Sequence, residues 1–94
     1  MQIYDIPEAF SLSIRLKLIS GLTGGEKTFT ELKNITKATD GNISVQLSKL
    51  EEWGYIKSDK RICGKRPKTS YKITDFGIQQ LKEYVDLLES ILNQ

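Results

Sequence analysis

Two strand-like runs, residues 55–60 and 68–73, interrupt a chain that otherwise has helical periodicity. The segment between them, residues 61–67, holds Gly64, Pro67 and three basic side chains. This composition predicts a β-hairpin with a charged tip. A single hairpin set among helices limits the chain to an α+β fold that is mostly helical.

Four helices are predicted around this hairpin. Residues 9–22 carry apolar side chains in two rows of helical spacing, which indicates a largely buried helix. A short second helix begins at Thr28, because Thr28 and Glu31 have the spacing of a capping box. Its inward-facing residues are predicted to be Phe29, Leu32 and Ile35. A tight connection over residues 36–39 then leads into the third helix.

The third helix is predicted over residues 39–53, with Thr39 or Asp40 as its N-cap and Gly54 at its end. At 100° per residue, one side of this helix is a core face. The residues on that side are Ile43, Gln46, Leu47 and Leu50. The opposite side is small, polar and lightly charged over its first two turns, and such a surface can enter the major groove of DNA.

Five residues of this third helix are candidates for DNA contact. Asn42 can offer a paired donor and acceptor to adenine, and Val45 can pack on a thymine methyl group. Lys49 can reach a guanine edge or a phosphate, and the two serines can bond to either bases or phosphates. The candidate residues are Asn42, Ser44, Val45, Ser48 and Lys49.

The hairpin tip is a second candidate contact, because the charge of the chain is uneven. Residues 57–72 hold seven basic residues and one acidic residue, although the net charge of the whole chain is only +2. A basic segment between acidic ends favours a surface that faces a polyanion. Arg and Lys suit a phosphate or a narrow minor groove. The candidate residues of the tip are Lys60, Arg61, Lys65, Arg66 and Lys68.

A final helix begins at Thr74–Asp75 and continues to residue 92. It is apolar on more than one face, which exceeds what covering one small core requires, so we expect a two-fold dimer interface. The candidate interface residues are Ile78, Leu81, Tyr84, Val85, Leu88, Ile91 and Leu92. Ile3, Tyr4 and Ile6 are expected to pack over this interface. Two-fold symmetry would place the two third helices about 34 Å apart and predicts a palindromic DNA site.

The residue types present exclude several classes of function. The sequence has no histidine and one cysteine, Cys63. Without histidine there is no Ser-His or Cys-His nucleophile pair and no common zinc site, so we expect neither enzyme activity nor a metal or cofactor. The single cysteine excludes an internal disulfide. Between basic neighbours its thiolate would be favoured, which suggests a redox switch as a hypothesis.

No apolar run approaches the roughly 20 residues that a membrane span needs. The first ten residues lack the basic start and apolar core of a signal peptide. Together with the single cysteine, this predicts a cytoplasmic protein with no membrane partner.

The order helix, helix, turn, helix, basic hairpin, helix is that of a winged helix-turn-helix. Two blocks of sequence resemble the small bacterial and archaeal winged-helix transcriptional regulators related to the MarR and ArsR groups. The first block is Thr39-Asp40-Gly41-Asn42-Ile43-Ser44, followed by Leu47-x-x-Leu50-Glu51-x-x-Gly54-Tyr55-Ile56. The second is Gly64-Lys65-Arg66-Pro67-Lys68-Thr69, followed by Tyr71-x-Ile73-Thr74-x-x-Gly77. The resemblance covers residues 8–92.

This resemblance implies a homodimeric, sequence-specific regulator that binds double-stranded DNA. Residues 39–53 would be the recognition helix in the major groove, and residues 60–68 would be a wing on the backbone or minor groove. The expected organisation is a single domain, 1–94, with an N-terminal extension (1–7) and a C-terminal dimerisation helix (74–92). Metal sensing of the ArsR type would need Cys, His and carboxylate ligand sets. The alternative is a winged-helix module that binds protein and not DNA.

Overall fold

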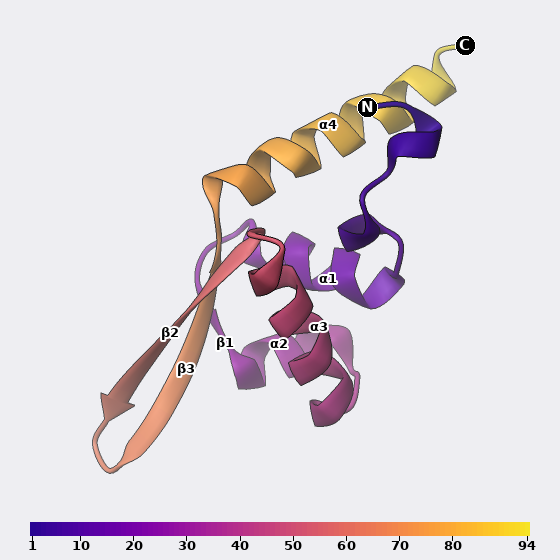
Figure 1. The fold of residues 1–94 in the computed structure, drawn as a ribbon. Coiled ribbons are helices and arrows are strands. Elements are labelled where there is room, and N and C mark those ends of the chain that lie inside the picture. Colours follow the sequence, from indigo (N-terminus) through magenta and orange to yellow (C-terminus); the bar gives the residue numbers. More distant parts are fainter.

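The computed structural model describes the backbone of residues 1–94 and all side chains except that of Cys63. The redox hypothesis for Cys63 therefore lies outside the described side chains. The described backbone forms four α-helices and a three-stranded antiparallel sheet (Figure 1), which confirms the predicted fold class. The elements are α1 (Ser13–Leu22), β1 (Lys27–Thr28), α2 (Phe29–Thr36), α3 (Asp40–Glu52), β2 (Ile56–Cys63), β3 (Arg66–Ile73) and α4 (Asp75–Leu92). Two short 3-10 turns, Ile3–Asp5 and Glu8–Phe10, precede α1.

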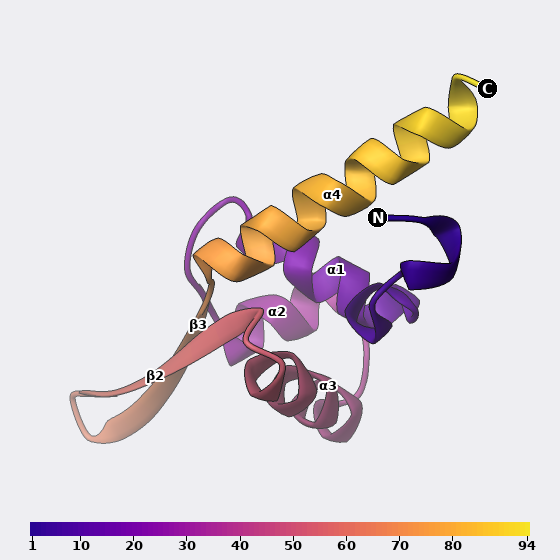
Figure 2. The ribbon, with the colours of Figure 1, turned by 45° about the horizontal axis from the view of Figure 1, so that its top comes forward.

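Helices α1, α2 and α3 pack around one hydrophobic core, which also receives the start of β2. Its fully buried members are Leu18, Ile19, Leu22, Leu32, Ile43, Leu47, Leu50 and Ile56. The molecule measures 55 × 25 × 21 Å. It is elongated because the β2–β3 hairpin and α4 project from this body in opposite directions (Figure 2).

Threonine side chains cap three of the helices as their spacing predicts. Thr28 accepts a hydrogen bond from the Glu31 backbone N–H, and the Glu31 carboxylate accepts one from the Thr28 N–H, which completes the capping box. Thr39 caps α3 and Thr74 caps α4 through the same type of bond. These caps satisfy backbone donors that helix geometry leaves free, so they fix where each helix begins.

Two predicted helix details are wrong. The first helix begins at Ser13, not at residue 9, because Leu12 is extended and residues 8–10 form a 3-10 turn. That turn buries Ala9 and Phe10 in the core. In α2, Ile35 was predicted to face inward but is 45% exposed. Thr36 is buried instead, and its hydroxyl donates a hydrogen bond to the Leu32 carbonyl.

The sheet differs from the prediction in two ways. The strands of the hairpin continue through the segment expected to be a loop, down to the pair Cys63↔Arg66, and leave a two-residue turn at Gly64–Lys65. Gly64 has φ +67°, as the first position of a type II′ hairpin turn requires. Strand β1 was not predicted. It pairs Lys27 with Tyr71 and Thr28 with Ser70 of β3.

Candidate nucleic-acid interface

Helix α3 begins directly after a turn that has no glycine. Lys37 adopts a left-handed conformation with φ 55° and ends α2, so the chain reverses within three residues. An exposed ion pair, Lys33 Nζ to Asp40 Oδ1 at 2.6 Å, spans the same turn. At its other end α3 stops at Gly54, whose φ is +85°. The Tyr55 N–H bonds back to the Leu50 carbonyl there, as in a Schellman motif.

The two faces of α3 are those that the sequence predicts. Ile43, Gln46, Leu47 and Leu50 are buried, and the opposite face is exposed. All five candidate contact residues lie on exposed positions: Asn42, Ser44, Val45, Ser48 and Lys49. Val45 is 51% exposed although it is branched and apolar. The face is free within the described chain to approach a partner.

A buried polar cluster lies beneath α3 and was not predicted. Arg15 of α1 is 6% exposed, and its Nε donates a hydrogen bond of 2.7 Å to Oε1 of Gln46. Gln46 Nε2 in turn donates to Oδ1 of Asn42 at 3.2 Å. One of the two hydrogen-bonding groups of Asn42 is therefore engaged by its own helix.

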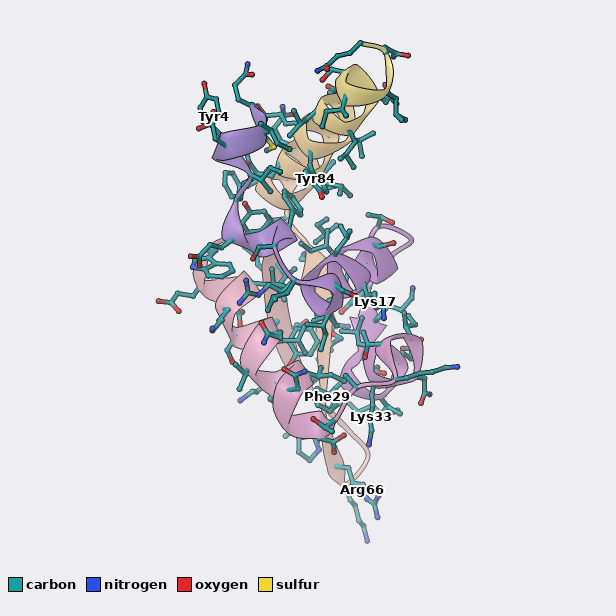
Figure 3. All side chains as sticks on the ribbon, turned by 90° about the vertical axis from the view of Figure 1, so that its right-hand side faces the viewer. Tyr4, Lys17, Phe29, Lys33, Arg66 and Tyr84 are labelled. Carbon is teal, nitrogen blue, oxygen red and sulfur yellow. The ribbon has the colours of Figure 1, made fainter. Side chains whose placement is uncertain are left out.

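The β2–β3 hairpin presents its basic residues to solvent. Lys60, Arg61, Lys65, Arg66 and Lys68 are all exposed. Arg61 Nε also donates to Asp59 Oδ2 at 2.8 Å, an exposed ion pair. Figure 3 shows Arg66 at the tip of the hairpin, at the same end of the molecule as Lys33 and Phe29 and far from Tyr4 and Tyr84. The basic tip and the start of α3 thus lie at one end.

An open groove of about 680 Å³ lies between the hairpin, the start of α2 and α3. This groove was not predicted, because it depends on how β3 packs beside α2. Its lining residues are Thr28, Phe29, Thr30, Glu31, Ser44, Pro67, Lys68, Thr69 and Tyr71. Hydrogen bonds from Thr28 lower the pKa of the Glu31 carboxyl in this groove. Burial raises the pKa of the Tyr71 phenol above its ordinary value of 10.0.

Helix α4 lies at the opposite end. Five of the seven candidate interface residues are exposed: Ile78, Val85, Leu88, Ile91 and Leu92. The other two, Leu81 and Tyr84, pack in part on the core of their own chain. The Tyr84 ring stacks on Phe10 with centroids 4.7 Å apart. An apolar row of α4 is therefore left uncovered within the chain.

Two further features concern the described residues. None of the helices is long and apolar enough to cross a membrane. The described side chains contain no cluster of three or more His, Cys, Asp or Glu residues that could hold a metal ion.

Comparison with known proteins shows the family. The family described as "Winged helix DNA-binding domain" matches residues 14–92. The chain belongs to this family. A protein of Methanocaldococcus jannaschii is 38% identical to this winged helix chain over 77 residues, which are 81% of this chain and 84% of that protein.

Solved structures share the fold of this winged helix domain. A transcriptional regulator homologue from Pyrococcus horikoshii has a TM-score of 0.76 and 27% identity, over 85% of this chain and 80% of that one. A MarR-family protein of Enterococcus faecalis has a TM-score of 0.79 at 19% identity, over 90% and 77% of the two chains. Bacillus subtilis PadR, solved with operator DNA, has a TM-score of 0.67 and 27% identity, over 73% and 44%. In the winged helix fold, α2 and α3 form the helix-turn-helix and the β2–β3 hairpin is the wing.

Proposed function

We propose that this winged helix domain is a sequence-specific transcriptional regulator that binds double-stranded DNA as a homodimer. The recognition helix α3 enters the major groove, and the wing, residues 60–68, lies on the backbone or in the minor groove. One observation carries this proposal: the exposed polar face of α3 and the cations of the wing lie at the same end of the molecule. The DNA complex of PadR, a structural neighbour, supports it.

Each contact residue has a role in this proposal. Ser44, Ser48 and Asn42 bond to base edges or phosphates, and Val45 packs on a thymine methyl group. Lys49 reaches a guanine or a phosphate. The wing cations neutralise phosphates, which supplies most of the sequence-independent affinity. The proposed wing contacts are Lys60, Arg61, Lys65, Arg66 and Lys68.

The remaining parts of the chain have proposed roles as well. We propose that residues 1–94 act as one domain, with residues 1–7 as an extension and residues 74–92 as the dimerisation helix. The uncovered apolar row of α4 supports this assignment. We also propose that the protein is cytoplasmic and that it acts without catalysis or a cofactor.

A salt series tests the wing contact directly. Fluorescence anisotropy is measured on random duplex DNA with the wild type and with Lys65→Ala/Arg66→Ala. Each phosphate contact releases about 0.9 counterion, so removing two contacts lowers the salt slope by about 2. The matched control, Lys17→Ala/Lys82→Ala, removes the same charge from exposed positions on α1 and α4.

The control should retain the wild-type slope. Equal slopes for the two double variants would contradict a wing contact. Absence of binding by the wild type at low salt would contradict DNA binding itself and favour the protein-binding alternative.

A further inference from the structure

Arg15 is a buried cation on α1. Its guanidinium donates to Gln46 Oε1 at 2.7 Å, to the Glu8 carbonyl at 2.7 Å and to Ser11 Oγ at 3.3 Å. It also lies over the Trp53 ring, 5.0 Å from the centroid. None of these partners is a carboxylate. A guanidinium stays protonated in proteins and has donors but no acceptor.

This chemistry fixes the orientation of the Gln46 side chain. Because Arg15 only donates, the Gln46 atom that faces it must be the carbonyl oxygen. The Gln46 amide nitrogen then lies on the other side of its carbonyl carbon and donates to Asn42 Oδ1 at 3.2 Å. Gln46 is 7% exposed, so water does not readily replace either bond. Arg15 alone fixes which end of the Gln46 amide is the oxygen, because it has no acceptor.

The orientation of Asn42 follows in the same way. Its oxygen is turned toward Gln46, and its nitrogen lies on the opposite side of Cγ. Asn42 is exposed on the first turn of α3. Val45 lies one turn later and Lys49 two turns later on the same edge of the helix. The group that it presents beyond the helix is therefore an NH2 donor.

We propose that Arg15 and Gln46 are positioning residues that make Asn42 a hydrogen-bond donor toward DNA. This inference rests on the proposed function. In the major groove, guanine offers the acceptors N7 and O6 and thymine offers O4, whereas cytosine offers only its N4 donor. Adenine also offers the acceptor N7, so Asn42 accepts guanine, thymine or adenine at its position and disfavours cytosine, which has no acceptor there. The paired contact with adenine that the sequence suggested is weakened, because Gln46 already occupies one of the two lone pairs of the Asn42 oxygen and turns that oxygen toward the helix.

The first test uses the free protein and no DNA. Exchange with water of the side-chain NH2 protons of Asn42 and Gln46 is measured by NMR. The expected result is slow exchange for Gln46 and fast exchange for Asn42, because only the Gln46 group is buried and donates within the protein. The reverse order would overturn the proposal.

The second test selects preferred sites from a randomised duplex library with the wild type, Asn42→Ala, Gln46→Glu and Gln46→Met. In Gln46→Glu both carboxylate oxygens accept, so Arg15 keeps its bond and the Asn42 amide turns round to donate inward. Asn42 then presents its oxygen, and the preference at one base should shift by about tenfold toward cytosine, which offers a donor and no acceptor in the major groove. Gln46→Met has no hydrogen-bonding group and should only relax the preference.

A merely structural role for Gln46 predicts that Gln46→Glu and Gln46→Met behave alike, and that result would overturn the proposal. An unchanged preference in Asn42→Ala would overturn it as well, while leaving DNA binding by the protein intact. If Gln46→Glu fails to fold, the NH2 exchange rates of Gln46 and Asn42 in the wild type still test the proposed orientation of the two amides. Absence of duplex binding by the wild type would instead contradict the proposed function.

Discussion

At the scale of single residues, Arg15 is a charged side chain that is buried in a small domain. Burying a charge costs free energy unless its donors find acceptors. Arg15 meets this requirement with neutral oxygens and the Trp53 ring in place of a carboxylate. Those acceptors belong to the segment before α1 and to α3, so one side chain joins the N-terminal turn to α3.

Glu31 makes the stability of α2 depend on pH. Its pKa is lowered chiefly because the carboxylate accepts the Thr28 N–H. A carboxyl whose folded pKa is depressed stabilises the fold above its ordinary value, near 4.5, and loses that contribution as pH falls through the folded value. We expect urea midpoints of the wild type to fall more steeply below pH 4.5 than those of Glu31→Gln.

The control for this titration is Glu52→Gln, which removes an exposed carboxylate at the end of α3. Its pH profile should follow that of the wild type. Identical pH profiles of the urea midpoint for Glu31→Gln and the wild type would show that the capping carboxylate does not contribute to the stability of the fold.

The sequence predicted which residues of α3 are exposed but not the buried position of Arg15. The face of α3 follows from 100° spacing alone, so Val45 and Lys49 could be assigned without tertiary information. Arg15 lies on one helical row with Leu18 and Leu22, and all three are buried. The one sequence feature that could have indicated a buried polar cluster was an arginine on an otherwise apolar row of α1. Its partner Gln46 lies 31 residues away, beyond any local pattern.

At the scale of elements, the start of α4 depends on Gly77. A Cβ at this position would lie 2.3 Å from the Tyr55 carbonyl oxygen and 2.9 Å from Ile73 Cγ1. The same carbonyl accepts the Thr74 N–H, so it cannot move without breaking the junction between β2 and α4. Gly77→Ala should therefore lower the free energy of unfolding by about 3 kcal/mol, measured by urea denaturation.

Gly41 offers a matched control, since it also lies in the first turn of a helix. A Cβ there meets nothing within 4 Å. Gly41→Ala should raise the stability by about 0.5–1 kcal/mol, because alanine favours the helix. A Gly77→Ala protein as stable as the wild type would contradict the close packing at this junction.

Caps and helices were predictable because their signals are local, within three or four residues of each end. The sheet was harder. Strand β1 has only two residues and exists through its pairing with β3, more than 40 residues later. Pro67 suggested a loop, yet it fits within β3 because β1 pairs only as far as Thr28↔Ser70 and leaves that edge open.

At the scale of the whole molecule, the basic wing and the apolar row of α4 lie at opposite ends (Figure 2). In the proposed function, this separation would let one end bind DNA while the other joins two chains. In the proposed dimer, Leu88 is in the middle of the exposed row and is 42% exposed within the chain.

Leu88→Asp should convert the dimer to a monomer without unfolding it, because the side chain is not part of the core. Sedimentation velocity measures the mass, and circular dichroism checks the helix content. Glu89→Ala, at the neighbouring exposed position, should remain dimeric. A wild type that sediments as a monomer would contradict the proposed interface.

Methylation interference on a selected duplex site tests the central claim most directly, because one reagent marks guanine N7 in the major groove and adenine N3 in the minor groove. With α3 in the major groove and the wing beside it, we predict two blocks of N7 interference about one helical turn apart. Minor-groove or backbone contacts of the two wings should flank them. Binding that is unaffected by N7 methylation, or a single unpaired block, would contradict the account.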